Sequence, residues 1–268
     1  MGPGPLASAG CGESSGTSRG DDGAAMERQN VVLTGGTGMV GGIALRACLE
    51  RADVARVTSI VRRPSGLAHP KLREIVHADF GSFGALHETL AGQDVGLFFL
   101  GVYTGGVSAA EFRRITVDCT QAFAAELRRR SPRAAFCFMS SKGADPSETS
   151  RWMYARDKGA AENALRALDF PRLHVFRPGY IHPVTPRREP SLTYRLARAL
   201  YPLIRKVTPH LGVDSDALAL TMVQVALHGV GGVAPEDRPL EQADIRALDE
   251  ARRRAEGASL SRSAARSP

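Results

Sequence analysis

The stretch of sequence that decides the fold is VVLTGGTGMVG, residues 31–41. It opens with a short apolar run, which is typical of a buried strand, and the apolar spacing of residues 43–51 predicts a helix directly after it. Between the two, Gly35 permits a tight turn, Gly38 lets the backbone approach a pyrophosphate, and Gly41 lets the helix pack closely on the sheet. Free N–H groups at the start of such a helix bind phosphates.

Strand, glycine loop and helix in this order predict a dinucleotide-binding loop, with an ordinary glycine-rich turn as the alternative. A second strand signal about 20 residues further on supplies the context that such a loop requires. The loop residues that we expect to contact the cofactor are Gly35, Thr37, Gly38, Met39 and Val40.

Strand and helix signals alternate through the middle of the chain. The run at residues 95–100 is continuously apolar, which is typical of a strand buried on both faces. The alternation predicts an α/β fold, a doubly wound Rossmann-type parallel sheet flanked by helices, as a single domain with a small C-terminal helical segment on the substrate side. The expected strands are 31–34, 57–61, 73–76, 95–100, 134–139 and 173–177, and the expected helices are 43–51, 83–90, 111–130, 154–168, 192–207, 214–228 and 245–254.

Both ends of the chain differ in composition from its middle. Residues 1–25 are rich in Gly, Ser, Ala and Pro and have almost no large apolar side chains, so we expect an unstructured tail. One NAD(P)-binding domain is then expected over residues 26–256, in which residues 180–212 form a lid on the substrate side. Residues 257–268 are rich in Ser, Ala and Arg and predict a second unstructured tail.

The charge and cysteine content exclude several classes of protein. The 35 Lys and Arg against 28 Asp and Glu give a formal charge of +7, but no nucleic-acid-binding motif accompanies it, so we expect no nucleic-acid partner. The four cysteines form no CxxC pair and no zinc spacing with histidine, which favours a reducing compartment and no metal site. The sequence has neither a secretory-signal pattern nor an apolar run of bilayer length, so we expect a cytoplasmic protein.

The end of the second strand indicates which dinucleotide is bound. An NAD site usually places an acidic residue there, whereas this chain has Arg62 and Arg63. A guanidinium pairs with a 2′-phosphate and a carboxylate repels it, so the two arginines favour NADP(H), the alternative being two solvated surface residues. The strand ends that follow are expected to meet the adenine and to pass beneath the cofactor, through Asp79 and Phe80 and through Leu100 and Gly101 respectively.

Ser141, Tyr154 and Lys158, which follow the fifth predicted strand, have the spacing of a catalytic set. Tyr154 and Lys158 are four residues apart, so they share one face of a helix, and Ser141 lies thirteen residues before Tyr154 at the end of a strand. An ammonium beside a phenol favours the phenolate. Tyr154 is therefore our candidate general acid or base, and Ser141, with Ser140 as a neighbouring candidate, would orient a substrate oxygen. The alternative is a contact on a surface helix.

Two further strings carry a family resemblance. They are SSKGAD at residues 140–145 and FRPG at residues 176–179. With Tyr154 and Lys158 between them, the chain resembles the Tat-interacting-protein oxidoreductase family, an atypical branch of the short-chain dehydrogenase/reductase superfamily, over residues 29–250.

The resemblance implies a Rossmann-type domain that binds NADP(H). It implies that Arg62 and Arg63 lie at the 2′-phosphate and that Lys158 holds the nicotinamide ribose. It also implies that Pro178, Gly179 and Ile181 pass near the nicotinamide.

One residue departs from the superfamily pattern. Many members have an asparagine on the helix after the fourth strand that helps a proton relay, and this chain offers Asp118 there. The atypical branch shares the difference, and it also includes proteins better described as regulators.

Leucines and arginines interleave along residues 192–207. This pattern predicts a helix packed over the cofactor cleft with its arginines in water. The alternative is a helix that contacts an anionic membrane surface or a protein partner.

Three functions are compatible with these features. The leading prediction is an NADP(H)-dependent oxidoreductase that acts on a small carbonyl or alcohol compound. The second is an NADPH-sensing regulatory binding protein with little turnover. The third is a sugar-nucleotide epimerase or dehydratase, for which the chain after residue 177 leaves little room.

Overall fold

The main sheet of the molecule has seven parallel strands in the order β3-β2-β1-β4-β5-β6-β9. The computed structural model describes residues 2, 28–102, 106–184 and 212–264. This architecture confirms the predicted doubly wound Rossmann-type fold. The strands are β1 (Gln29–Thr34), β2 (Val54–Val61), β3 (Leu72–Val76), β4 (Val95–Phe98), β5 (Ala135–Met139), β6 (Arg172–Arg177) and β9 (Leu240–Glu241).

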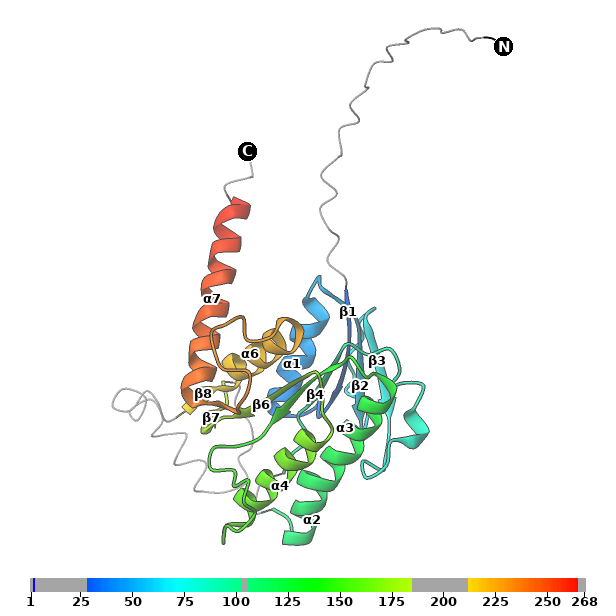
Figure 1. The fold of residues 1–268 in the computed structure, drawn as a ribbon, viewed down its shortest axis with the longest axis vertical. Helices are drawn as coiled ribbons and strands as arrows, with labels where there is room; N and C mark the ends of the chain where they lie inside the picture. The colour runs from blue at the N-terminus through cyan, green and yellow to red at the C-terminus, as the bar shows by residue number, and fades with distance from the viewer. Residues whose placement is uncertain (1, 3–27, 103–105, 185–211, 265–268) are drawn as a thin grey trace.

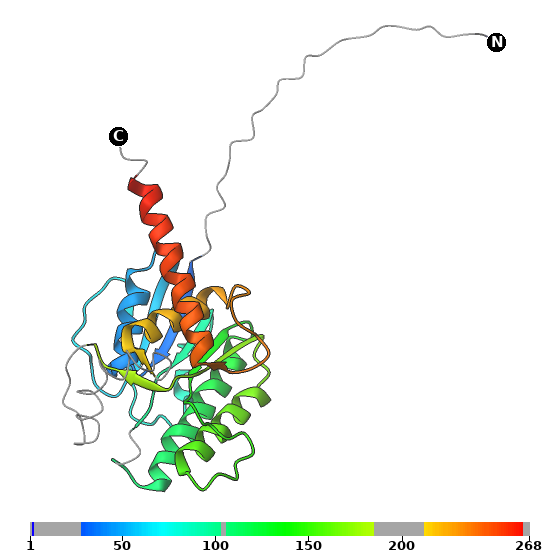
Figure 2. The same cartoon turned by 90° about the vertical axis from the view of Figure 1, so that its left-hand side faces the viewer.

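Helices cover both faces of the sheet, as Figures 1 and 2 show. The side chains of β5 explain how the layers pack. Ala135 and Cys137 belong to the apolar cluster under α1 and α6, and Phe136 and Phe138 belong to the cluster under α3 and α4. The helices are α1 (Met39–Glu50), α2 (Ala109–Arg113), α3 (Cys119–Arg130), α4 (Met153–Ala167), α6 (Ser215–His228) and α7 (Gln242–Ala264).

The strand order reverses between β1 and β4, which pair side by side. In open α/β sheets a crevice forms outside the carboxyl ends of the strands at this point, and ligands bind in it. The glycine loop follows β1 and Leu100 follows β4, so both border the crevice. A second, two-stranded sheet of β7 (Tyr180–His182) and β8 (Gly212–Asp214) follows β6 in the chain.

Two predicted helices are wrong in detail. Residues 83–90 contain only a single 3₁₀ turn, η1 (Gly84–Leu86), because Phe83 and Leu90 are both drawn into the core. The predicted helix at 111–130 begins earlier, at Ala109. The side chain of Ser108 caps it by accepting a hydrogen bond from Glu111 N at 3.2 Å. It is then interrupted by a π-helical segment, η2 (Arg114–Asp118), before α3 continues.

The C-terminal prediction is also wrong. The last helix, α7, extends through Gly257 to Ala264, where an unstructured tail was expected from residue 257. Within this extension, Ser261 Oγ donates to the carbonyl oxygen of Gly257, one turn earlier, at 3.0 Å. The N-terminal tail (residues 1–25, apart from Gly2) and the predicted helix at 192–207 lie outside the described residues. Across the described ranges, no helix is long and apolar enough to cross a membrane.

Candidate active site

The glycine loop is packed too tightly for side chains at Gly35, Gly36 and Gly41. Gly35 has a φ of +75°, and a Cβ there would lie 2.7 Å from the backbone carbon of Phe99. A Cβ on Gly41 would overlap the carbonyl oxygen of Gly35. The third glycine therefore sets how closely α1 approaches the loop. Gly38 is exposed, and its N–H donates to the carbonyl oxygen of Gly35 at 2.8 Å.

A pocket of about 340 Å³ opens at the start of α1. Three of the predicted loop residues line it, while the side chain of Val40 is 3% exposed and belongs to the core. Arg46 and Ser65 also line the pocket and were not predicted, because only the folded chain brings the second turn of α1 beside the loop after β2. The lining residues are Gly36, Thr37, Gly38, Met39, Gly42, Ile43, Arg46, Ser65, Leu67 and Ser215.

A smaller pocket, of about 80 Å³, lies across the ends of β2, β3 and β4. Arg62, Phe80, Leu100 and Gly101 were predicted for this region, and the structure brings all four together. Asp79 does not line the pocket; its carboxylate is exposed and accepts a hydrogen bond from Gly81 N at 2.9 Å. The lining residues are Arg62, Ala78, Phe80, Leu100, Gly101, Val102, Glu111, Arg114, Ile115 and Cys119.

The arginines around this pocket differ in how far their charge is compensated. Arg114 forms two hydrogen bonds of 2.9 Å with Glu111, and this carboxylate raises the pKa of the guanidinium. Arg62 and Arg63 are exposed and form no ion pair within the described ranges. An uncompensated guanidinium at the end of β2 suits an incoming anion.

The π-helical segment η2 contributes residues that the sequence did not predict. Arg114 and Ile115 enter the lining of the smaller pocket from it. Such segments occur frequently at functional sites, because the extra residue per turn redirects nearby side chains. No pattern in the sequence marks this position, so the missed signal is conformational. Asp118, at the end of the same segment, is exposed.

The catalytic candidates gather around the turn after β5. Lys158 Nζ donates to the carbonyl oxygen of Met139 at 2.9 Å and lies 4.8 Å from the ring centre of Phe138. On the other side, a Cβ on Gly143, whose φ is +82°, would be 3.4 Å from the hydroxyl of Tyr154. Lysine and tyrosine thus flank the turn that carries Ser141.

Burial affects both Ser141 and Lys158. Within the described ranges the hydroxyl of Ser141 is buried and has no hydrogen-bond partner, a state that it shares with the hydroxyls of Thr34, Ser59 and Thr221. A buried hydroxyl without a partner costs about 1–3 kcal/mol, so a ligand oxygen at this place would stabilise it. Burial lowers the pKa of the Lys158 ammonium to about 8, and the charge of Glu162 opposes this shift.

A glycine positions the helix that carries Tyr154 and Lys158. Gly159 faces the backbone of Asp145, and a Cβ there would overlap the Asp145 carbonyl. Asp145 N in turn donates to Ala155 O at 2.9 Å. The carboxylate of Asp145 accepts hydrogen bonds from the backbone of Ser147, Thr149 and Ser150. The glycine therefore lets α4 lie directly against the loop after β5.

The segment after β6 closes the other side of the turn. Lys142 N donates to Pro178 O at 2.8 Å, and Gly179 N donates to the side chain of Gln242 at 2.9 Å. Ile181 lies on β7 opposite Val213, half-buried against the core. His182 follows it, with Nδ1 at 3.3 Å from a carboxylate oxygen of Asp214.

The groups at this end of the sheet suit a dinucleotide. A tight glycine turn at a helix start, beside exposed arginines that form no ion pair within the described ranges, has the features of a phosphate-binding site. In the part of the chain that the structure describes, no group of three His, Cys, Asp or Glu could hold a metal ion.

Comparison with known families gives the class of protein that this fold and site define. Residues 35–196, more than half of the chain, match the NAD(P)H-binding family, so the chain belongs to that family. It is an NAD(P)H-binding protein with a Rossmann-type fold.

Two known proteins have sequences similar to that of this chain. HTATIP2 of Rattus norvegicus is 30% identical over 158 residues, which cover 58% of this chain and 64% of that protein, just under two thirds. The mitochondrial protein fmp52 of Aspergillus clavatus is 31% identical over 222 residues, covering 77% of this chain and 90% of that protein.

A solved structure shares the fold. The enzyme WbmH of Bordetella bronchiseptica, in complex with NAD⁺, superposes with a TM-score of 0.58. The two chains are 17% identical, and the matched region covers 76% of this chain and 74% of the WbmH chain.

Proposed function

We propose that the protein is an NADP(H)-dependent oxidoreductase of the short-chain dehydrogenase type, acting on a small carbonyl or alcohol compound. The observation that carries the proposal is the buried hydroxyl of Ser141, which has no hydrogen-bond partner among the described residues and lies in the turn flanked by Tyr154 and Lys158. A hydroxyl in this state is suited to receive a substrate oxygen. Its place outside the carboxyl ends of the strands is where substrates bind in such folds.

The cofactor would lie across the crevice between β1 and β4. The backbone of Thr37 and Gly38 would face its phosphates, and Phe80 and Leu100 would face the adenine end. Arg62 and Arg63 would pair with the 2′-phosphate, since within the described ranges no carboxylate competes for them. When bound, the nicotinamide supplies or accepts a hydride.

The chain's own residues handle the proton. In carbonyl reduction, Tyr154 Oη gives its proton to the substrate oxygen while Ser141 Oγ donates a hydrogen bond to the same oxygen. The Lys158 ammonium favours the phenolate that remains on Tyr154. In alcohol oxidation Tyr154 takes the proton instead.

Substitution of the tyrosine tests this proposal. Tyr154→Phe should lower the turnover of a panel of carbonyl substrates by about 10²–10⁴-fold, because the proton donor is lost. NADPH binding, measured by calorimetry, should persist. The exposed Ser82→Ala variant is the control and should behave as the parent protein. Undiminished turnover by Tyr154→Phe would sink the catalytic assignment.

A second candidate is an NADPH-sensing binding protein. The exposure of Asp118, the residue in the relay position, favours it, because an exposed carboxylate suggests no ordered relay toward Tyr154. The two candidates differ in the same substrate panel. Tight NADPH binding without oxidation of the cofactor supports the sensor, and steady turnover supports the enzyme.

The cellular location stays a prediction. The name of the fmp52 relative assigns that protein to mitochondria, whereas the composition of this chain favours the cytoplasm. We propose a cytoplasmic protein, which imaging of the tagged full-length chain tests.

A further inference from the structure

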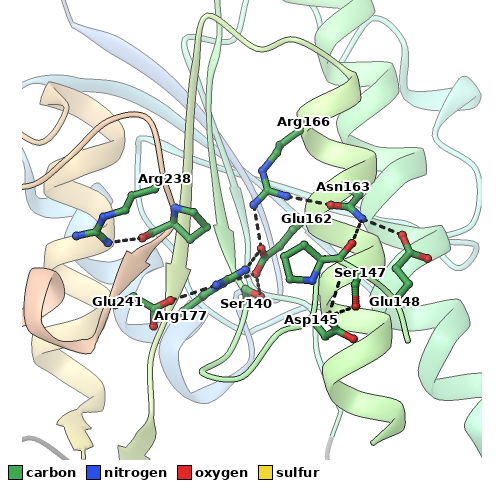
Figure 3. A network of polar contacts seen from close by, with 12 residues as sticks. Ser140, Asp145, Ser147, Glu148, Glu162, Asn163, Arg166, Arg177, Arg238 and Glu241 are labelled. Atoms are coloured by element: carbon green, nitrogen blue, oxygen red, sulfur yellow. Dashed lines mark hydrogen bonds and ion pairs between the residues drawn. The ribbon is translucent and has the colours of Figure 1, made fainter. Parts of the chain in front are cut away.

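Behind the catalytic candidates lies a network of ion pairs centred on Glu162 (Figure 3). Glu162 is one helical turn beyond Lys158 on α4, and its side chain is fully buried. It accepts hydrogen bonds from Ser140 Oγ at 2.5 Å and from Arg177 Nε and Nη2 at 2.9 and 2.6 Å. Arg166 adds a fourth hydrogen bond at 3.2 Å from the exposed side of the helix.

The partners of Glu162 are the residues just before the two segments that border the candidate site. Ser140 precedes Ser141 at the end of β5, and Arg177 precedes Pro178 at the end of β6. Because one carboxylate binds both, the two strand ends are tied to α4 at a single point. Their backbones also meet directly, where Ser140 N donates to Phe176 O at 2.8 Å.

A role in folding alone does not explain why a carboxylate stands here. Burying an ion pair costs about as much desolvation energy as the attraction returns, and apolar residues of similar size often give equal or higher stability. An apolar residue would hold the layers together. It would not supply a negative charge one turn from a desolvated ammonium.

The charges around Lys158 show what Glu162 contributes. Burial lowers the pKa of Lys158 to about 8, and Glu162 is the charge that counteracts this effect. Arg177 from β6 and Arg166 from α4 both face Glu162, and Glu241 faces Arg177 at 3.2 Å. From β5, Lys158 meets only a carbonyl oxygen and the Phe138 ring among the described contacts.

We propose that Glu162 is a positioning residue of the candidate active site. It fixes the strand ends that carry Ser141 and Pro178, and its charge keeps Lys158 protonated near neutral pH. The role of Glu162 in turnover rests on the proposed function. The charge of Lys158 itself can be measured without any turnover.

The test is a titration of the lysine side chains by NMR. The chain has only four lysines, at positions 71, 142, 158 and 206, so ¹³C-labelled lysine gives a simple spectrum. The signal of Lys158 is assigned by its loss in Lys158→Met. We expect the midpoint of Lys158 to fall by about one pH unit in Glu162→Gln, because the compensating charge is removed. An unchanged midpoint in a folded Glu162→Gln protein overturns the proposal.

Two further variants keep the test decisive. Ser140→Ala removes a hydrogen bond and no charge, so the Lys158 midpoint should stay as in the parent protein. Arg166→Ala removes a half-exposed cation that partly cancels Glu162, so the midpoint should rise even if Glu162→Gln fails to fold. A midpoint that falls in Arg166→Ala contradicts the assignment.

Turnover gives the second readout. In an active enzyme, the alkaline limb of kcat/KM should move to lower pH in Glu162→Gln together with the NMR midpoint, and it should not move in Ser140→Ala. If no substrate is turned over, the proposed function fails while the NMR result still decides the role of Glu162. A shifted NMR midpoint with an unshifted alkaline limb would show that Lys158 does not serve turnover, which overturns the functional half of the inference.

Discussion

Ser141 and Ser131 both have buried hydroxyls, and the two hydroxyls differ in their hydrogen bonds. Ser131 Oγ donates to Leu90 O and accepts from Gln93 N, both at 2.8 Å, whereas Ser141 Oγ has no partner within the described ranges. A hydroxyl that is buried without a partner destabilises the fold, and one with two partners stabilises it. Under the proposed function, the same chemical group binds a ligand at Ser141 and stabilises the fold at Ser131.

Replacing each serine by alanine separates the two roles. Ser141→Ala should leave the free energy of unfolding unchanged or raise it by up to about 1 kcal/mol, while turnover falls by about 10²-fold. Ser131→Ala should lower that free energy by about 1–3 kcal/mol. Urea unfolding and steady-state kinetics measure both. A Ser141→Ala protein that is as destabilised as Ser131→Ala contradicts the ligand role.

His174 makes stability depend on pH. Its imidazole is buried in β6, and burial lowers its pKa to about 4. The unfolded chain therefore binds the proton between about pH 4 and 6.5 while the folded chain does not, so stability rises with pH through this window. We expect the protein to be about 3 kcal/mol less stable at pH 4 than at pH 7 through this group alone.

The measurement is urea unfolding from pH 4 to 7 for His174→Gln, which should lose most of this slope. His87, whose side chain is 43% exposed, supplies the matched control, and His87→Gln should retain the slope. A parental slope in His174→Gln contradicts the prediction.

At the scale of elements, the glycines of α4 and α7 differ in their surroundings. Gly159 in α4 faces the Asp145 backbone with no space for a Cβ, and Gly257 in α7 faces open space. Gly159→Ala should lower the free energy of unfolding by about 1–3 kcal/mol and reduce turnover, because α4 must move away from the turn. Gly257→Ala should raise the free energy of unfolding by up to about 1 kcal/mol.

Thermal unfolding tests whether Gly159→Ala is less stable and Gly257→Ala more stable than the parent protein. A Gly159→Ala protein with parental stability would mean that α4 does not rest on the Asp145 loop.

The sequence predicted elements well where the signal is local. The strands around the glycine loop were found because apolar runs end in glycines there, and α4 because Tyr154 and Lys158 repeat at helical spacing. The π-helical turn at Arg114–Asp118 and the short strand β9 were missed, because tertiary pairing and not composition creates them. The end of α7 was missed because its serines and arginines suggested a tail, whereas the helix continues to Ala264.

At the scale of the whole molecule, the candidate site is assembled from segments far apart in the chain. The glycine loop, Phe80 and Leu100 could be predicted because each directly follows a strand of a recognisable pattern. Arg46, Arg114 and Glu162 could not, because their roles depend on which helix packs beside which strand end. The position of Asp79 outside the pocket could not be predicted either, because its carboxylate accepts a hydrogen bond from Gly81 N in the turn that follows.

Selectivity for the cofactor depends on this whole arrangement and tests the central claim most directly. The thermal midpoint should be measured with NADPH and with NADH, for the parent protein and for the double variant Arg62→Ala, Arg63→Ala. At 100 times its Kd a ligand adds about 2.7 kcal/mol, which corresponds to a rise of roughly 5–10 °C in a domain of this size. We predict that rise with NADPH, a much smaller one with NADH at the same concentration, and the loss of the difference in the double variant. Equal stabilisation by both cofactors, or by neither, would contradict an NADP(H)-dependent oxidoreductase.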